Sequence, residues 1–574
     1  MSGITSVLDI AAQAMAAEQV GVEVTSHNIA NVNTPGYSRQ VVNYETAYPE
    51  LAPWGPMGRG VRVLNIERNF DRFIQARLDE KTATMAEYQA KSDQLEQVAT
   101  FFNETQDDGL NAQLAEFWAA WNDLADNPQG AAERLALIRR AENLNDAFNS
   151  RADQLAQARQ SVTQEIAPIL EEVNTRAARI AQLTEEIQES EDGTQVNNDL
   201  RDKRQTEITE IEKLVGVSYY TTGDGTVNVI FPNGLPLVTG VTSFTLDYTI
   251  SPTDTVDVTW NGPGGLVEHI SSSLDGGKLT GLIEVRDTII PQFQADFDNL
   301  AKEFIAAINS QHSQGVGLDL FTSVTGTYAV NDPTDPLNAT DLPFGAEITN
   351  GTFQIFVDRN GAPHSNATIT VDPTDTLDDL VNAINLSAVG ADLTASVVNN
   401  QLNIVANAGT DSFGFAADTS NVLMALGVNT FFTGDSAYTL GINDTVADSP
   451  NMIAAGQIDV TTGLHPVGDN QNALALSDLE NSAVITVGTD TLTVTDAFRR
   501  LISDLGLEAE QSATQAKFYQ DQVNQFQAMR DDVSGVSLDE ELTNLIKYQR
   551  AYQAAARLVG VADEMYQTLL STKE

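Results

Sequence analysis

The side chains most able to do chemistry in this chain are its histidines and its many carboxylates. No two histidines stand at the i, i+4 spacing of a zinc-binding helix, and none is followed by the glutamate that such a motif requires. We therefore interpret the histidines as surface or turn residues rather than metal ligands. The five are His27, His269, His312, His364 and His465.

Other catalytic patterns are absent from the sequence as well. The chain has no cysteine, which excludes disulfides, thiolate nucleophiles and thiolate metal sites. It has no Gly-x-Ser-x-Gly elbow and no phosphate-binding loop, and residues 262–265 lack the dinucleotide-binding spacing. Neighbouring acids such as Asp378 and Asp379 are common in a chain with 80 acidic residues, so no glycosidase pair can be identified. We expect no catalytic residue, no cofactor and no metal.

Two acidic loops, residues 331–341 and 372–379, could coordinate calcium through carboxylate and carbonyl oxygens. Neither loop has the full ligand spacing with a central glycine and a terminal glutamate, so we favour solvated turns. The aromatic residues Phe117, Trp118 and Trp121 stand at helical spacing, which indicates a core more than a ligand platform.

The composition limits the partners that this chain can have. Of 574 residues, 80 are acidic and 31 are basic, which gives a formal net charge of −49. Between Lys302 and Arg499 the only cation is Arg359. Nucleic acids and anionic membrane surfaces are bound through Lys and Arg, so we expect neither partner. No run of roughly 18 apolar residues predicts a membrane-spanning helix, and no positive segment before Arg39 predicts a cleavable secretory signal.

The first segment of the chain is predicted to be a long helix with a narrow apolar seam. Its apolar residues recur every seven positions, which is typical of a coiled coil rather than of a wide core-facing stripe. A second row fades at Glu18 and Thr25, so the helix alone should be marginally stable. The seam residues are Ile4, Leu8, Ala11, Met15, Val22 and Ile29.

The last segment has a similar pattern. Residues 537–540 predict a capping box at the start of a helix, in which Ser537 and Glu540 satisfy free amide groups. The helix that follows has an imperfect seam, formed by Leu538, Leu542, Leu545, Tyr552, Val559, Tyr566 and Leu570. Two incomplete seams indicate either that each helix completes the other or that neighbouring molecules complete both.

Between the terminal helices the pattern changes several times. Pro35 and Gly36 fit the central positions of a type II turn, so the first helix should stop near Asn31. Long helices are expected from residue 71 to about 215, with breaks at 127–128 and 191–193 and a kink or restart at Pro168. From about residue 216 the period becomes two, with a hairpin signal at 223–225, and helix returns over residues 278–312.

One later segment has a pattern of its own. We predict strands at 354–357, 368–371, 395–398 and 402–405, with a helix at 376–384 and a turn at Asn399 and Asn400.

The order of helix, sheet, helix, sheet and helix predicts a multidomain α+β fold. Both chain ends should form a long helical coiled-coil domain, from which mostly β domains project outward. The predicted parts are a coiled-coil helix (1–35), a turn region with long helices (36–215), the first part of an outer β domain (216–277), a returning or bridging helix (278–315), an outer β domain (316–484) with an inserted module at about 345–434, a helical segment (485–535) and a C-terminal coiled-coil helix (536–574).

Six blocks of the sequence resemble those of bacterial flagellar axial proteins, the family of rod, hook and hook-associated proteins, and they occur in the family's order. They are residues 27–40, 60–71, 198–217, 309–315, 468–473 and 534–552. The first block is the family's N-terminal signature, and its residues are expected to set the turn that redirects the chain. These residues are Asn28, Asn31, Asn33, Thr34, Pro35, Gly36, Tyr37, Ser38 and Arg39.

The resemblance implies a structural subunit of the flagellum that connects the hook to the filament and adapts their lattices. It implies a ring of copies with terminal helices in an inner tube, contacts to the hook protein and to a second hook-associated junction protein, and export through the flagellar type III apparatus. It also implies an export chaperone on the C-terminal helix. Segment 353–406 looks like an insertion module of unassigned role.

Three other interpretations remain open at this stage. Both seams could be ordinary intramolecular core, although the resemblance favours assembly between molecules. The chain could instead be a surface-exposed enzyme acting on polysaccharide or cell wall, or a calcium-stabilised adhesin.

Overall fold

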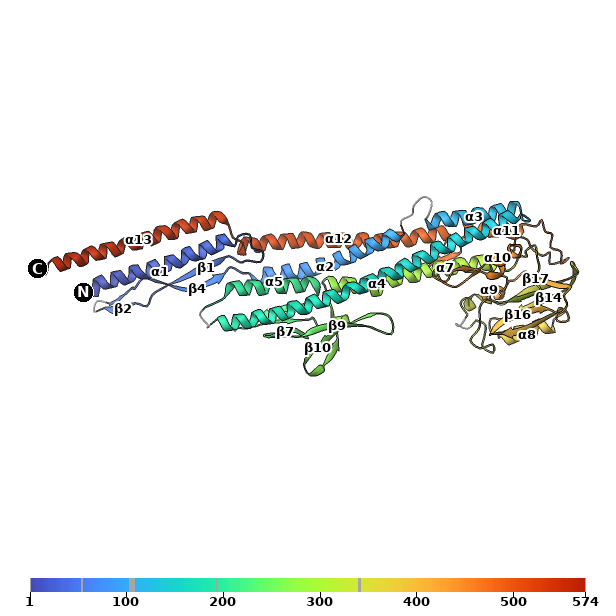
Figure 1. Ribbon diagram of the computed structural model, residues 1–574, viewed down its shortest axis with the longest axis horizontal. Coiled ribbons are helices and arrows are strands. Elements are labelled where there is room, and N and C mark those ends of the chain that lie inside the picture. The colour runs from blue at the N-terminus through green and yellow to red at the C-terminus, as the bar shows by residue number, and fades with distance from the viewer. Residues whose placement is uncertain are drawn as a thin grey trace. The chain divides into compact units, whose positions relative to one another are not determined.

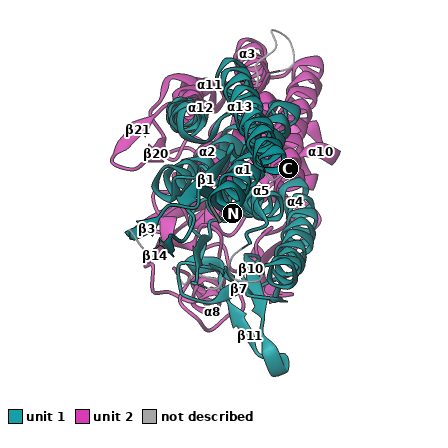
Figure 2. Cartoon of the chain, turned by 90° about the vertical axis from the view of Figure 1, so that its left-hand side faces the viewer, with its two compact units in different colours: residues 1–94, 161–288, 509–574 teal, residues 95–160, 289–508 magenta. Residues whose placement is uncertain are grey.

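The computed structural model describes residues 2–52, 55–102, 109–191, 195–223, 225–338 and 342–572. The chain divides into two compact units, each built from separate stretches of sequence (Figure 2). Unit 1 comprises residues 1–94, 161–288 and 509–574, and unit 2 comprises residues 95–160 and 289–508. Long helices form the chain ends and most strands lie in the middle of the sequence, as expected for the predicted multidomain α+β class.

The helices account for both ends of the chain (Figure 1). They are α1 (Ser2–Ala30), α2 (Arg72–Phe101), α3 (Leu110–Asp126), α4 (Ala131–Ser190), α5 (Asn198–Leu214), α6 (Lys278–Glu284), α7 (Ile290–His312), α8 (Leu377–Leu386), α9 (Val422–Ala425), α10 (Asp444–Asp448), α11 (Gln471–Asp478), α12 (Val494–Ser534) and α13 (Leu538–Ser571). None of the helices formed by the described residues is long and apolar enough to cross a membrane.

The predicted helix breaks have different outcomes. The break at 127–128 is confirmed, because α3 ends at Asp126 and α4 begins at Ala131. Of the kink or restart predicted at Pro168, the restart is wrong, since α4 is one continuous helix of 60 residues that contains Pro168. A proline inside a helix removes one backbone hydrogen bond, and the neighbouring side chains of Ile166, Ile169 and Leu170 are buried. That packing holds the helix together across the missing bond. Of the break at 191–193, residues 192 and 193 lie outside the described residues.

All paired strands are antiparallel among the described residues. Unit 1 has two strand pairs, β1 (Gln40–Thr46) with β4 (Val61–Arg68) and β2 (Glu50–Ala52) with β3 (Gly55–Met57). It also has a four-stranded sheet, in the order β5 (Ser218–Thr221), β6 (Val227–Ile230), β7 (Pro236–Thr239) and β8 (Thr242–Ser243). A three-stranded sheet follows, in the order β11 (Val267–His269), β10 (Val256–Asn261) and β9 (Thr245–Ile250). Strands β5 and β6 pair on either side of the predicted 223–225 hairpin, of which Asp224 lies outside the described residues.

In unit 2 the strands form two three-stranded sheets and two short pairs. They are β12 (Ser323–Thr325), β16 (Gln401–Ala406) and β15 (Leu393–Val398) in the order β12-β16-β15, β14 (Ala362–Val371), β13 (Gly351–Arg359) and β17 (Asp411–Ala416) in the order β14-β13-β17, β18 (Phe432–Thr433) with β19 (Gly441–Ile442), and β20 (Ile485–Val487) with β21 (Asp490–Leu492).

The predictions for segment 353–406 are confirmed. Strands β13, β14, β15 and β16 and helix α8 occupy the predicted places. Thr376 caps α8 in a capping box with Asp379. Asn399 and Asn400 have φ of 53° and 63°, the left-handed conformations that asparagine tolerates in a tight hairpin turn between β15 and β16.

The core of unit 2 is aromatic. Phe117, Trp118 and Trp121 are at most 1 % exposed and pack with rings such as Phe304 and Phe431, which confirms that they are core. Close ring packing of this kind adds to the apolar burial itself.

The interpretation of the histidines as surface or turn residues is wrong for His312. Its ring is fully buried in unit 2, where Nδ1 lies 2.8 Å from the Asn429 carbonyl and the Ala454 amide donates to Nε2 at 3.0 Å. Burial lowers the pKa of His312 to about 4, so the ring stays neutral, with Nδ1 donating and Nε2 accepting. The spacing of the histidines along the chain gave no sign that His312 is the last residue of α7 and lies inside the core.

Candidate assembly interface

Helices α1 and α13 lie side by side in unit 1 and run antiparallel (Figure 1). The end of α1 meets the start of α13, where Asn28 donates a hydrogen bond to Glu541. Of α13, only Glu541, Ala555 and Ala562 are buried. At Gly21 of α1, an added Cβ would lie 2.8 Å from both the Tyr548 ring of α13 and the Tyr44 hydroxyl of β1, so these two side chains leave no room for one at position 21. The fully buried part of α13 therefore consists of two alanines and one glutamate, and the Tyr548 ring packs against α1 at Gly21.

The predicted seam residues of α1 lie partly in this contact. Ile4 and Ala11 are buried, whereas Leu8, Met15, Val22 and Ile29 are half-buried. Thr25, which looked like the end of the second row, is buried at 3 % exposure.

The predicted seam of α13 is mostly open to solvent in the single chain. Leu545 and Val559 are half-buried, and the exposed members are Leu538, Leu542, Tyr552, Tyr566 and Leu570. Leu570 is 60 % exposed. Other large apolar side chains of the helix are exposed too, namely Ile546, Leu558, Val561, Met565 and Leu569. We call these ten residues the exposed α13 set. A concentration of apolar surface of this kind on one element marks an interaction site.

The turn after α1 has the predicted geometry. The Tyr37 amide donates to the Thr34 carbonyl at 3.2 Å, and Gly36 has φ of 77°, which confirms the type II turn. Asn31 Nδ2 donates to the His27 carbonyl at 3.0 Å and closes the end of the helix. Thr34 Oγ1 donates to Asn31 Oδ1 at 3.1 Å. The remaining predicted turn residues, Asn33 and Pro35, are exposed.

Asn28 joins three parts of unit 1 through its side-chain amide. Nδ2 donates to Glu541 Oε2 and to the Gln40 carbonyl, both at 2.9 Å. Oδ1 accepts from the Tyr37 hydroxyl at 2.7 Å and from the Gln40 amide at 3.0 Å. Asn28 is 1 % exposed, and its amide is fully used. It therefore fixes the end of α1 to β1 and to α13.

Arg39 completes this network at the break between α12 and α13. Its Nε and one terminal nitrogen both lie 2.8 Å from Glu541 Oε1, and its other terminal nitrogen lies 2.9 Å from Glu540 Oε2. The Arg39 amide donates to the Ser534 carbonyl at 2.8 Å. We call Asn28, Arg39 and Glu541 the buried polar joint.

The predicted capping box at 537–540 is wrong. Ser537 has the extended backbone of a cap residue but makes no side-chain capping bond. The Glu540 carboxylate is instead paired with Arg39, and this charge-assisted contact competes with the reach back to the helix start.

Ser38 holds the chain to α5. Its amide donates to Asp202 Oδ2 at 2.8 Å and its hydroxyl donates to Asp202 Oδ1 at 2.9 Å. Arg68 lies 2.5 Å from the same carboxyl. Burial raises the pKa of Asp202, and Arg68 opposes the shift. Burial and nearby carboxylates, Asp202 and Glu541 among them, also raise the pKa of Tyr37, which keeps its hydroxyl as a donor.

Sequence reasoning missed Glu541 and Asp202 as site residues, although both lie inside blocks used for the resemblance. The available signal was Arg39 itself, because a cation in a signature turn needs an anionic partner when it becomes buried.

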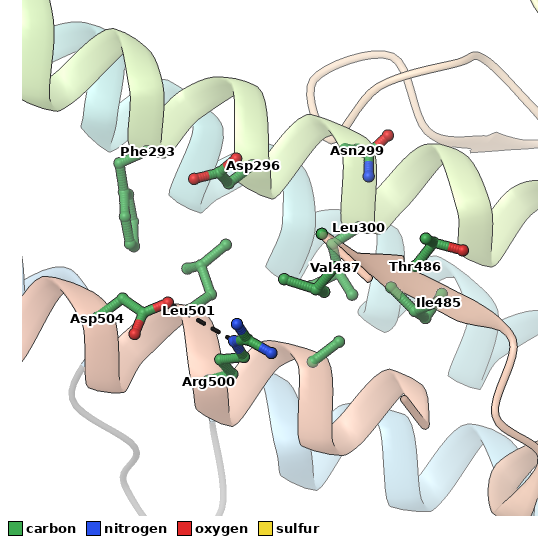
Figure 3. A pocket seen from close by; sticks show the side chains of 12 residues that line it. Phe293, Asp296, Asn299, Leu300, Ile485, Thr486, Val487, Arg500, Leu501 and Asp504 are labelled. Atoms are coloured by element: carbon green, nitrogen blue, oxygen red, sulfur yellow. Dashed lines mark ion pairs between the residues drawn. The ribbon is translucent and has the colours of Figure 1, made fainter. Parts of the chain in front are cut away.

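One cavity of unit 2 brings acidic side chains together, and a cation pairs with one of them. This cavity, of about 160 Å³, is lined by α7, β20 and α12 (Figure 3). Asp296 comes from α7, and Asp504 from α12, where it is paired with Arg500 at 4.0 Å. Arg500 also pairs with Asp490 at 2.8 Å. A cation that binds two acids suits a structural contact better than an acid–base pair.

The acidic loops are used locally as turns. Asp332 accepts hydrogen bonds from the amide and hydroxyl of Thr334, and Asp372 accepts the same pair from Thr374. Within the described part of the chain, no group of three or more His, Asp or Glu could hold a metal ion. Residues 339–341 of the first loop lie outside that part.

Three family models match separate stretches of the chain. Residues 8–37 match the flagella basal body rod protein model, and residues 532–572 match the C-terminal model of the flagellar basal body rod FlgEFG proteins. These two stretches contain most of α1 with its turn, and α13. Residues 95–326 match the helical domain of flagellar hook-associated protein FlgK. All three models describe flagellar proteins, so the chain is similar to flagellar axial proteins at both ends and in the region between them.

Curated relatives match over nearly the whole chain. Flagellar hook-associated protein 1 of Escherichia coli K12 is 26 % identical over 99 % of this chain and 100 % of its own length. The same protein of Bacillus subtilis 168 is 25 % identical over 98 % and 97 %. The solved structure of the flagellar hook junction protein FlgK from Burkholderia pseudomallei has the same fold, with a TM-score of 0.54 and 17 % identity over 80 % of this chain and 100 % of that one. Over nearly its whole length the chain is therefore similar to flagellar hook-associated protein 1.

Proposed function

We propose that this chain is a structural subunit of the bacterial flagellum that connects the hook to the filament and adapts their lattices. In this role the terminal helices of neighbouring copies pack against one another in an inner tube. The main support is the exposed α13 set, because ten large apolar side chains stay at least partly in water when α1 is already paired with α13. Burying a large apolar side chain fully stabilises a contact by about 1.5–3 kcal/mol, so this surface can supply the association energy.

The proposed contacts start from the predicted seams. Four seam residues of α1 are only half-buried, and together with the exposed α13 set they can form one apolar surface across both helices. They are Leu8, Met15, Val22 and Ile29. The turn residues from Asn31 to Tyr37 lead the chain away from α1, and the buried polar joint fixes the direction in which α13 leaves α12. A subunit built this way folds its own turn first and completes its apolar seams against other copies.

The proposed partners follow from the same surface. They are further copies of this chain, the hook protein and a second hook-associated junction protein. We propose export through the flagellar type III apparatus, with a chaperone covering the exposed α13 set until assembly. The absence of cysteine is compatible with passage of an unfolded chain, since no disulfide has to be avoided or re-formed. We assign no catalytic role to any residue.

Charge substitutions in the two seams test this function. Leu8→Asp and Leu545→Asp should leave the β domains folded but abolish incorporation into flagella, because a buried unpaired charge is strongly unfavourable. The matched control is Thr543→Asp, at an exposed position of the same helix, which should still be incorporated. Normal motility in either seam variant would contradict the proposal.

Limited proteolysis of the dilute monomer gives a second test. The end of α13 should be cleaved well before the middle of the chain, because a large part of its apolar surface has no cover. Equal protection of both chain ends and the centre would count against assembly through the terminal helices.

A further inference from the structure

Two carboxyl groups are buried against each other in unit 1. Asp79 of α2 is 1 % exposed and Glu212 of α5 is 4 % exposed. Their side chains are in hydrogen-bonding contact. Neither carboxyl forms an ion pair with any described residue. Buried acids are normally paired with a cation or a metal ion, so this pair needs another explanation.

The hydrogen-bond donors around the two carboxyl groups are neutral, and they face Asp79 rather than Glu212. Asp79 Oδ1 accepts from Gln75 Nε2 at 2.8 Å and from Thr209 Oγ1 at 2.9 Å, and Asp79 Oδ2 accepts from Gln205 Nε2 at 3.4 Å. Glu212 Oε2 is buried without a protein donor facing it. Two ionised carboxylates have only acceptor oxygens and cannot hydrogen bond to each other. A proton on one of them supplies the missing donor.

The charged and titratable groups near the pair are on other elements. Arg530 of α12 attracts the Asp79 carboxylate but is not ion-paired with it, and Tyr219 of β5 faces both acids. Arg68 of β4 acts on Tyr219 and is paired with Asp202 of α5.

On α5 itself, Glu210 is already paired with Lys213. A cavity of about 370 Å³ is lined by Gln75, Gln205 and Thr209, the same residues that donate to Asp79. Arg530 lines the same cavity, but no described cation forms an ion pair with either acid.

We propose that Asp79 and Glu212 hold one proton between them near neutral pH and act as a pH-sensitive latch between α2 and α5. The protonated pair holds the two helices together. Release of the proton places two like charges in contact inside the protein and loosens this part of unit 1. The inference does not depend on the proposed function.

The direction of the pH effect follows from burial. Burial raises the pKa of Asp79 to about 6, and burial together with the Asp79 charge raises the pKa of Glu212 well above its ordinary value. The two acids titrate as a unit. Because the pair binds its proton more tightly in the folded state, its stabilising contribution is complete at pH values below the ordinary carboxyl pKa. It is lost as the pH rises through the raised values.

Hydrogen–deuterium exchange of the full chain, corrected for the intrinsic pH dependence of exchange, tests the latch. Between about pH 6 and about pH 9 the opening equilibrium of peptides from α2 and α5 should increase with pH, with a limiting slope of about tenfold per pH unit for release of one proton. In Glu212→Gln an amide replaces the protonated carboxyl as donor to Asp79. This variant should show little pH dependence and should be better protected than the wild type at about pH 9.

Two further variants keep the test decisive. Asp79→Asn also places an amide donor in the contact and should flatten the profile. Glu210→Gln changes a half-buried acid on the same helix and should keep the wild-type slope. A flat wild-type profile, or an unchanged slope in both pair variants, would overturn the proposal. Restoration of protection at about pH 9 by millimolar magnesium chloride alone would also overturn it, because a metal ion would then replace the proton.

Discussion

Glu541→Ala is the substitution expected to disturb the α1–α13 contact most directly. The Glu541 carboxylate is 2 % exposed and accepts hydrogen bonds from Asn28 and from two nitrogens of Arg39. Removing one partner of a buried, hydrogen-bonded ion pair costs about 3–5 kcal/mol, since the other charge stays buried and unpaired. The Arg39 side chain is 20 % exposed and can regain some water. We therefore expect the lower end, about 3 kcal/mol, which is roughly a 100-fold change in the opening equilibrium.

Hydrogen–deuterium exchange of the full-length monomer measures this change. Peptides from the first turns of α13 and the last turns of α1 should lose protection by roughly two orders of magnitude in Glu541→Ala. The matched control is Glu540→Ala. Glu540 contacts the same arginine at 2.9 Å but is 61 % exposed, and an exposed ion pair contributes only about 0–1 kcal/mol.

The protection of α1 and α13 peptides in Glu541→Ala, compared with that in Glu540→Ala, shows whether the buried glutamate holds the two helices together. If Glu541→Ala changed protection no more than Glu540→Ala, the buried polar joint would not hold α13 against α1. The direction in which α13 leaves α12 would then have to be set by the apolar contacts between α1 and α13 alone.

Three further predictions concern single residues. Gly21→Val should destabilise the α1–α13 contact by about 1–3 kcal/mol through overpacking, because its Cβ would lie 2.8 Å from the Tyr548 ring; thermal unfolding and exchange of α1 peptides measure this. His312 has its pKa lowered to about 4, so it binds a proton more weakly when folded and its contribution to unit 2 stability should decline as the pH falls from about 6.5 to about 4. Calorimetry of the full chain should show a weaker pH dependence in this window for His312→Gln. Arg359 lowers the pKa of Asp411 to about 2, so the ion pair should stabilise the β13–β17 contact above about pH 4 and lose this effect as the pH falls through about 2. In Arg359→Leu, hydrogen exchange of β17 peptides should therefore be faster than in the wild type near neutral pH. Acidification should then accelerate their exchange less than it does in the wild type.

Local patterns in the sequence predicted local structure well. The type II turn at Pro35 and Gly36 depends on the conformations that these two residues prefer, and the hairpin at Asn399 and Asn400 depends on their tolerance of positive φ. In both places the residue types determine the backbone with little help from the rest of the chain. Helix α8 also begins within one residue of its predicted start, and the structure adds a capping box there that was not predicted.

Long-range pairing could not be predicted in the same way. Arg39 and Glu541 are separated by 502 positions, and no local pattern shows which of 80 acids will meet a given arginine. The failed capping box at Ser537 has the same origin, because Arg39 draws the Glu540 carboxylate away. Thr25 looked like a gap in an apolar row, yet it is buried, since a threonine can fill a narrow helix contact as well as a larger apolar side chain.

The buried strip of α13 that faces α1 separates two tasks that most helices combine. The residues of α13 that are fully buried in the subunit are two alanines and one glutamate, whereas ten large apolar side chains of the same helix keep at least 36 % of their surface exposed. Substitutions among those outer side chains can therefore alter the twist or spacing of neighbouring copies without unfolding any of them. Evolution can adjust how one polymer is matched to the next while the building block itself stays the same.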